Sequence, residues 1–329
     1  MFVKDGKRSR MKIIVYNNAL KSRHKNMISE TADKVGAEVC FIDSEDSIPE
    51  GFEDAEVFYG TGLKTIGKSK HIKWFCAPSA GVDFLLKPGV FANEDCIITN
   101  SAGAYGVSIA EHIIMVSLMM MRQMHVFFRK SISGEWGKPL PQKSLKDCRI
   151  TVLGTGDIGS SFAKRAKAFE PKSIVGVCRS GKCSESSFDK IFRMDELDEV
   201  LRETELLVMC LPGTAETEGV LSKERMALLP QGAYVVNVGR GSAIDESALV
   251  ENLESGKLAG AALDVFANEP LPEASPLWNT KNLIITPHVA GNLTLDHTLD
   301  KNVEMFCENM VNYAEGRPLK HVVDKARGY

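Results

Sequence analysis

Three residues with side chains suited to anion binding and proton transfer follow apolar segments in the second half of the chain. Arg240 comes after "AYVVNVG", Glu269 after "LDVFAN" and His288 after "LIITP". An arginine can hold a carboxylate through two parallel hydrogen bonds, and a histidine beside a carboxylate can give or take a proton. A single histidine after a strand is more often structural, but its combination with Arg240 and Glu269 favours a catalytic site. Together the three residues predict a site that binds a small carboxylate and transfers a proton next to it.

A glycine-rich turn follows the strand-like segment "RITVL". The sequence "VLGTGDIG" holds Gly154, Gly156 and Gly159 in the G-x-G-x-x-G spacing and opens the helical stretch "SSFAKRAKAF". The first glycine permits a tight turn, the second lets a pyrophosphate approach the backbone, and the third lets helix and strand pack closely. This turn, with Asp157 and Ile158 at the start of the helix, is therefore predicted to bind a dinucleotide. The alternative is a glycine-rich turn that binds no ligand.

The next strand-like segment, "SIVGVC", bears on the choice of cofactor. It ends in Cys178, where an NAD-binding domain commonly has an acidic residue for the ribose hydroxyls, and Arg179, Ser180 and Lys182 follow. Because position 178 has no carboxylate, no negative charge there would repel a 2′-phosphate, and the cations of Arg179 and Lys182 would attract it. The pattern predicts NADP as the preferred cofactor, with NAD as the second possibility. The alternative is a basic turn that is merely solvated.

Two series of short apolar segments, each alternating with helical stretches, must position these residues. The first begins at Met11 and ends near Asn100, and the second runs from "RITVL" to "NLIITPHVAG" with six strand candidates. The alternation predicts an α/β fold of two doubly wound parallel sheets, Rossmann-like or flavodoxin-like. We expect a dinucleotide-binding domain at residues 100–292 and a discontinuous substrate-binding domain at residues 1–99 plus 293–329. We expect the active-site cleft to lie between them.

The segment "VSIAEHIIMVSLMMMRQMHVFFR" is predicted to form one helix that packs between domains or between subunits. Its apolar centre, "IIMVSLMMM", is 9 residues long. A membrane span needs about 20 apolar residues, so the sequence predicts no membrane association.

Composition excludes several classes of protein. A formal net charge of −3 over 329 residues gives no broad positive field, which argues against nucleic acid as a partner. The eight cysteines include no CxxC pair, and no His/Cys cluster has ligand spacing. We therefore expect reduced thiols and no metal site. The N-terminal segment lacks the long apolar stretch of a signal peptide, which favours a cytoplasmic protein.

Several motifs in order make the chain resemble the D-isomer-specific 2-hydroxyacid dehydrogenase family. They are "SAGVD", "VLGTGDIG", "LPGTAETEGVL", "NVGRGSAIDESAL", "ALDVFANEPLP" and "PHVAG". The resemblance covers nearly the whole chain from Met11, and the segment from Met1 to Arg10 precedes its usual start. It implies a nicotinamide-dependent oxidoreductase of the CH–OH group of 2-hydroxy acids.

The resemblance also implies roles for individual residues. Arg240 corresponds to the substrate arginine, His288 to the acid/base, and Glu269 to the carboxylate that orients the histidine and favours its protonated form. Ala80 and Gly81 of "SAGVD" correspond to residues whose backbone N–H groups bind the substrate carboxylate. The alternative for this segment is a sharp turn with no ligand.

Further positions implied by the resemblance surround the substrate and the cofactor. Tyr105 lies where family members vary beside the substrate or the nicotinamide. Asp264 corresponds to the partner of the nicotinamide carboxamide, although it could be only a hydrogen-bond partner at a strand end. The remaining positions expected to touch the cofactor are Pro212, Val238, His288 and Gly291.

The resemblance implies a homodimeric reductase that converts glyoxylate, hydroxypyruvate or a similar small 2-oxo acid to the D-2-hydroxy acid. Two other functions stay open. The same family contains corepressors that bind the cofactor as a signal, although this chain has no long disordered tail. Formate or phosphite oxidation is the other. Formate dehydrogenases of the family have glutamine in place of Glu269, so the glutamate argues against formate.

Overall fold

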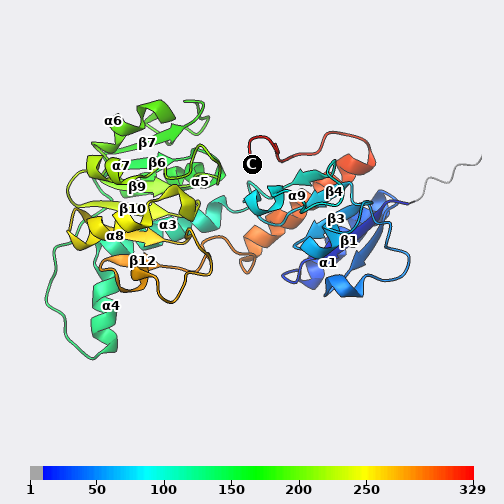
Figure 1. Cartoon of the computed structure of the whole chain (residues 1–329), viewed down its shortest axis with the longest axis horizontal. Helices are drawn as coiled ribbons and strands as arrows, with labels where there is room; N and C mark the ends of the chain where they lie inside the picture. Colours follow the sequence, from blue (N-terminus) through cyan, green and yellow to red (C-terminus); the bar gives the residue numbers. More distant parts are fainter. Residues whose placement is uncertain (1–9) are drawn as a thin grey trace, which may run out of the picture. The chain divides into compact units, whose positions relative to one another are not determined.

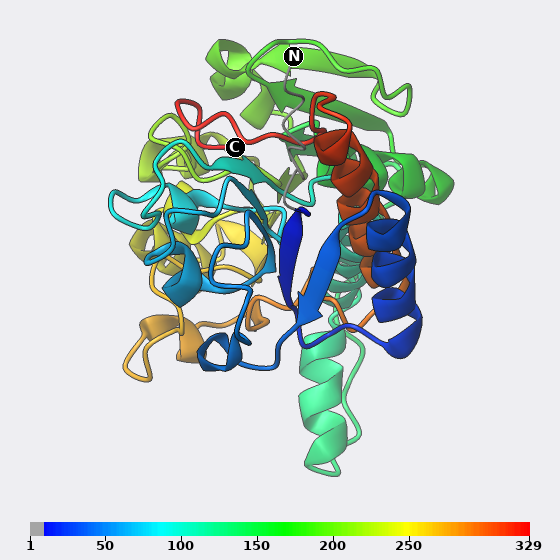
Figure 2. The same cartoon turned by 90° about the vertical axis from the view of Figure 1, so that its right-hand side faces the viewer.

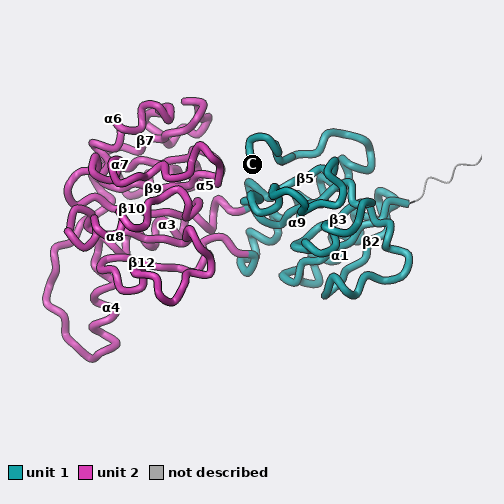
Figure 3. The backbone as a smooth tube through the Cα atoms, in the orientation of Figure 1, with its two compact units in different colours: residues 1–104, 293–329 teal, residues 105–292 magenta. Residues whose placement is uncertain are grey.

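The computed structural model describes residues 10–329, which divide into two compact units (Figures 1 and 3). Unit 1 comprises the described residues up to Ala104 together with Leu293–Tyr329, and unit 2 comprises Tyr105–Asn292. The division follows Ala104, whereas the boundary expected from the sequence follows residue 99. Nearly all of the segment from Met1 to Arg10 lies outside the described residues.

Unit 1 contains a five-stranded parallel sheet with the strand order β2-β1-β3-β4-β5. The strands are rich in β-branched and aromatic residues and are largely buried, as expected when helices cover both faces of a sheet. The order reverses at β1, which is the flavodoxin-like arrangement. The elements are β1 (Lys12–Tyr16), α1 (Ser22–Lys34), β2 (Glu38–Phe41), β3 (Val57–Gly60), α2 (Leu63–Ile66), β4 (Trp74–Cys76), β5 (Ile97–Thr99) and α9 (Asp296–Ala314).

Helix α9 completes the core of unit 1 although it lies near the end of the chain. It runs beside α1 (Figure 2). Its buried side chains belong to the same hydrophobic cluster as those of the sheet. The ring of Phe306 stacks on that of Tyr59 with centroids 4.2 Å apart, and it also packs against Trp74. The apolar surface of the first third of the chain is thus covered by residues more than 200 positions away in the sequence.

Unit 2 contains a seven-stranded parallel sheet with the order β12-β11-β10-β9-β6-β7-β8. Both units therefore confirm the predicted α/β class. The strands are β6 (Arg149–Leu153), β7 (Ser173–Cys178), β8 (Lys190–Arg193), β9 (Leu206–Met209), β10 (Ala233–Asn237), β11 (Leu258–Leu263) and β12 (Leu283–Ile285). The helices are α3 (Gly106–Met121), α4 (Met124–Ile132), α5 (Asp157–Ala166), α6 (Leu197–Leu201), α7 (Lys223–Leu228) and α8 (Glu246–Glu254).

Two local features differ from the sequence-based expectations. Strand β8 was not among the six expected strands, because "KIFR" at the edge of the sheet is short and only partly buried. The predicted single helix is broken at Gln123, whose φ of 58° lies in the left-handed region and ends α3. The second part, α4, projects from the rest of unit 2 (Figure 1).

Among the described residues, none of the helices combines the length and apolar character needed to cross a membrane.

Candidate active site

Arg240, Glu269 and His288 follow β10, β11 and β12, three neighbouring strands of unit 2. The carboxyl ends of parallel strands lie at one edge of the sheet, where doubly wound folds bind ligands. His288 Nδ1 lies 2.7 Å from Glu269 Oε2, and Glu269 Oε1 accepts a hydrogen bond from the Phe266 N–H at 2.9 Å. The carboxylate therefore fixes the imidazole through Nδ1, which leaves Nε2 as the nitrogen that does not contact Glu269.

The backbone at His288 is unusual. Its φ of 54° places a non-glycine residue in the left-handed region, which is uncommon and costs conformational energy. The Asp264 carboxylate stabilises this turn by accepting hydrogen bonds from two of its backbone N–H groups. Its Oδ1 accepts from the Val289 N–H at 2.9 Å, and its Oδ2 accepts from the Ala290 N–H at 3.0 Å.

Asp264 is also the end of a side-chain hydrogen-bond chain that the sequence did not reveal. The Thr286 hydroxyl donates to Asp264 Oδ1 at 2.6 Å, so it can only accept from His112 Nε2, 3.3 Å away. Burial lowers the pKa of His112, although the charge of Asp264 opposes this. Asp264 itself is 2% exposed. The one sequence signal for these hydrogen bonds is His112 itself, a histidine within a largely apolar helix.

The turn that carries Arg240 is held by Asn237, the last residue of β10. Asn237 Nδ2 donates to the Arg240 carbonyl at 2.8 Å, and its Oδ1 accepts from the Gly239 N–H at 3.0 Å. Asn237 is fully buried, whereas Arg240 is partly exposed. The guanidinium Nη1 donates to the Gly239 carbonyl at 2.8 Å, so the side chain folds back along its own turn.

The glycine-rich turn joins β6 to α5 as predicted from its spacing. Gly154 has a φ of +93°, and a Cβ on Gly159 would collide with the Gly154 carbonyl, so helix and strand can approach only with glycine there. A Cβ on Gly156 would meet no atom within 4 Å, and this residue directly precedes α5. Asp157 and Ile158 then form the first turn of the helix. Such a turn presents backbone N–H groups to a phosphate.

The turn after β7 gathers polar groups around Cys178. Partial burial would raise the pKa of the Cys178 thiol, but hydrogen bonds from Thr155, Ser180 and nearby backbone N–H groups outweigh it and lower the pKa. The Lys182 N–H donates to Ser180 Oγ at 3.2 Å and shapes the turn. Arg193 of β8 pairs in register with Cys178, and its side chain lies close to Gly181. Arg193 was not predicted because its strand was not predicted, and its guanidinium Nε donates to Asp195 Oδ1 at 3.3 Å.

The other predicted contact residues occupy different places. Pro212 and Val238 follow β9 and β10 at the same sheet edge, and the Pro212 carbonyl accepts from Thr217 Oγ1 at 2.6 Å. Tyr105 is 6% exposed, and burial raises the pKa of its hydroxyl. A Cβ on Gly291 would lie 3.0 Å from the Tyr105 ring. Ala80 and Gly81 follow β4 and belong to unit 1.

No group of three or more His, Cys, Asp or Glu side chains within residues 10–329 is arranged to hold a metal ion.

Comparison with known proteins gives a consistent result. Residues 114–290 match the family model described as "D-isomer specific 2-hydroxyacid dehydrogenase, NAD binding domain". Glyoxylate/hydroxypyruvate reductase A of Salmonella newport is 31% identical over 265 residues, which cover 79% of this chain and 83% of that protein.

Solved structures of the same family resemble the fold over almost its entire length. A D-isomer specific 2-hydroxyacid dehydrogenase family protein from Aeromonas salmonicida is 30% identical with a TM-score of 0.85, covering 96% of this chain and 100% of that one. A D-isomer specific 2-hydroxyacid dehydrogenase from Xanthobacter autotrophicus, crystallised with NADPH and MES, is 28% identical with a TM-score of 0.82, covering 98% and 100%.

Proposed function

Because the chain belongs to the D-isomer specific 2-hydroxyacid dehydrogenase family, we propose that it reduces a small 2-oxo acid, such as glyoxylate or hydroxypyruvate, to the D-2-hydroxy acid. The family makes it an NAD(P)-dependent oxidoreductase acting on 2-hydroxy acids. The observation that carries the finer proposal is the 2.7 Å pairing of His288 with Glu269 on the sheet edge that also presents Arg240.

Each of the three side chains has a distinct task in this reaction. The nicotinamide, when bound, supplies a hydride to C2 of the 2-oxo acid. Arg240 binds the substrate carboxylate and polarises the C2 oxygen through its planar fork, which a lysine would do less well. His288 donates the Nε2 proton to that oxygen, so the carbonyl becomes an alcohol and the imidazole becomes neutral. Glu269 accepts the Nδ1 proton and fixes the orientation of the ring, so that Nε2 is the nitrogen that transfers the proton.

We further propose that NADP is preferred over NAD. A thiol rather than a carboxylate ends β7, and Arg179 and Lys182 lie in the turn that follows it. The side chain of Arg193 lies next to Gly181 of this turn and pairs with Asp195. A 2′-phosphate carries about two negative charges and pairs well with arginine and lysine side chains. The relative from Xanthobacter autotrophicus was crystallised with NADPH. The remaining contacts proposed for the dinucleotide are Gly154, Gly156, Asp157, Ile158, Gly159, Ser180, Pro212, Val238, Asp264 and Gly291.

The experiment is a loss-of-absorbance assay of the purified protein. NADPH and NADH are offered separately with glyoxylate, hydroxypyruvate, pyruvate and bulkier aliphatic and aromatic 2-oxo acids. The proposal expects rapid oxidation of NADPH with a small 2-oxo acid and slower oxidation of NADH. A protein that binds NADPH but turns over none of these acids would instead favour the sensor function.

We also propose a homodimer that forms through α4. Met124, Phe128 and Ile132 recur every fourth residue and so share one face of the helix, and they are 46%, 63% and 73% exposed. Trp136, just beyond the helix, is 98% exposed. Apolar side chains on a projecting segment are typical of a protein interface.

The dimer is tested by light scattering. The wild type should have the mass of a dimer, and Phe128→Asp with Ile132→Asp should shift it toward the monomer. Met27→Asp, on an exposed position of α1, is the control and should leave the mass unchanged. A monomeric wild type, or a dimer that survives the double substitution, would contradict this interface.

A further inference from the structure

The loop that follows β4 has its carbonyl groups engaged one after another. The Ala77 carbonyl accepts from Ser101 Oγ at 2.9 Å and the Ser79 carbonyl accepts from the Ser101 N–H at 3.0 Å. The Gly81 carbonyl accepts from Ser79 Oγ at 2.9 Å. Two asparagines take the other two carbonyls. Asn302 Nδ2 donates to Pro78 at 2.8 Å, and Asn100 Nδ2 donates to Ala80 at 2.9 Å.

The N–H groups of the same loop are in the opposite situation. Within the described part of the chain, the Ala80 and Gly81 N–H groups donate to no acceptor, and both residues are only partly buried. Backbone N–H groups need a partner, and successive ones that share a turn form a site for an anion. With its carbonyls held by donors, the loop offers N–H groups to a ligand.

Asn302 is suited to holding the Pro78 carbonyl because both its amide nitrogen and its amide oxygen form hydrogen bonds. It lies on α9 and is 1% exposed, and its Oδ1 accepts from the hydroxyl of the fully buried Tyr59. Tyr59 in turn accepts from Asn17 Nδ2 at 3.3 Å. An apolar residue at position 302 would remove the acceptor of the Tyr59 hydroxyl proton and the amide donor to the Pro78 carbonyl, and aspartate would lack that donor.

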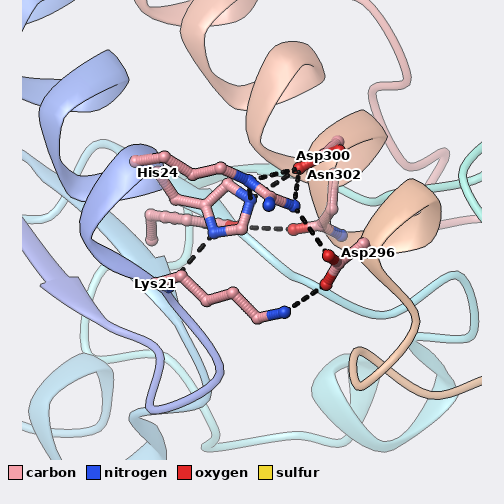
Figure 4. Close-up of polar contacts among 7 residues, drawn as sticks. Lys21, His24, Asp296, Asp300 and Asn302 are labelled. Carbon is pink, nitrogen blue, oxygen red and sulfur yellow. Dashed lines mark hydrogen bonds and ion pairs between the residues drawn. The ribbon is translucent and has the colours of Figure 1, made fainter.

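The helix that carries Asn302 is itself fixed by polar contacts with α1 (Figure 4). The fully buried His24 accepts the Lys21 N–H on Nδ1 at 3.1 Å, so Nε2 carries the proton and donates to Asp300 at 2.7 Å. Arg23 also donates to Asp300, at 2.7 Å. Asp300 is two residues before Asn302, so these contacts fix the part of α9 that carries Asn302.

Asn100 fixes the other side of the loop. It follows β5 and is 9% exposed, and its Oδ1 accepts from the Ala102 N–H at 3.2 Å while its own N–H donates to the His321 carbonyl at 3.1 Å. The backbone N–H and the amide oxygen of Asn100 are therefore both held, which orients its amide nitrogen toward the Ala80 carbonyl. Asn100 and Asn302 thus hold adjacent parts of the loop from two elements that are far apart in sequence.

We propose that Asn100 and Asn302 are positioning residues, which hold the Pro78–Gly81 loop so that the Ala80 and Gly81 N–H groups bind the substrate carboxylate. The inference rests on the proposed function, because it takes the 2-oxo acid as the anion. Neither asparagine contacts the substrate; both act through the loop.

The test compares Asn100→Ala and Asn302→Ala with a matched control, Asn309→Ala. Asn309 is also a buried asparagine of α9, but it bonds to the backbone of Lys320, away from the loop. Steady-state assays give kcat and KM for the 2-oxo acid, and calorimetry gives the dissociation constants of NADPH and, with NADP⁺ present, of oxalate. The melting temperature of each variant is measured in parallel.

Each loop variant should raise KM and the oxalate dissociation constant about tenfold, equivalent to about 1.4 kcal/mol, while kcat and NADPH binding stay within about twofold. Asn309→Ala should lower the melting temperature without changing KM. Unchanged oxalate binding in the loop variants, an equal change in Asn309→Ala, or a wild type that binds no oxalate would overturn the inference. Should Asn302→Ala not fold, Asn100→Ala decides alone. If the wild type reduces no 2-oxo acid but its oxalate binding depends on both asparagines, the proposed function fails and the positioning role stands.

Discussion

His288 Nδ1 and Glu269 Oε2 lie 2.7 Å apart, and the second oxygen of the glutamate is held by the Phe266 N–H at 2.9 Å. The Phe266 N–H, in the backbone just after β11, thus fixes the Glu269 carboxylate, which in turn fixes the imidazole. A proton donor on a rigid support can be aimed at one atom of a substrate without a large loss of entropy on binding.

Replacing the proton donor should separate chemistry from binding. His288→Gln keeps a polar side chain but removes the acid, so kcat should fall by roughly two to four orders of magnitude. The NADPH dissociation constant, measured by fluorescence titration, should stay nearly unchanged. His297→Gln, at an exposed position, is the control. Normal turnover in His288→Gln would exclude His288 as the acid.

The cation beside Cys178 should distinguish the two cofactors. Arg179→Ala should raise the dissociation constant of NADPH about tenfold or more and leave that of NADH nearly unchanged, because only NADPH carries the 2′-phosphate. Binding is measured by fluorescence for both cofactors. Arg202→Ala, which removes an exposed arginine of the same unit, should change neither. Equal losses for both cofactors would mean that Arg179 does not contact the phosphate.

The hydroxyl of Thr286 should matter to turnover although it lies behind the acid/base. Thr286→Val removes the bond to Asp264 and leaves the His112 N–H without an acceptor, which costs about 1–3 kcal/mol of stability. Because Asp264 also holds the Val289 and Ala290 N–H groups, we expect the turn at His288 to shift and kcat to fall about tenfold. Thr280→Val, which loses a bond from a buried threonine to the Pro276 carbonyl, is the matched control. Equal kcat values in the two variants would argue against this support.

The Cys178 thiol should be alkylated at lower pH than an ordinary thiol. Its pKa is lowered, so the reactive thiolate persists as the pH falls, whereas burial raises the pKa of Cys76, Cys96 and Cys210. Mass spectrometry after brief iodoacetamide treatment at several pH values would locate the modification. NADPH should protect Cys178 if the cofactor covers this turn. Preferential labelling of a buried cysteine would contradict the prediction.

The parts of the fold and site that could be predicted from the sequence are those with local signals. Alternating apolar segments and the glycine spacing located β6, α5 and the strands that precede Arg240, Glu269 and His288. Strand β8 escaped because "KIFR" at a sheet edge resembles a polar turn, and Arg193 was missed with it. The break at Gln123 has no glycine to mark it. The contacts of Asp264 with Val289 and of Asn302 with Pro78 join residues brought together only by the folded chain, so no sequence spacing could reveal them.

The discontinuous construction of unit 1 has a consequence for biosynthesis. Unit 2 is one continuous stretch, and it can fold as soon as residue 292 has left the ribosome. Unit 1 is the first to be synthesised, but its folding cannot be completed until α9 has been made. The reason is that α9 supplies part of its core through Leu299, Val303, Phe306 and Met310. Until those residues emerge, the apolar face of its nascent sheet stays uncovered. The first part of the chain to be made is therefore the last to complete its core, and a polypeptide truncated before α9 exposes an apolar surface that chaperones and proteases can recognise.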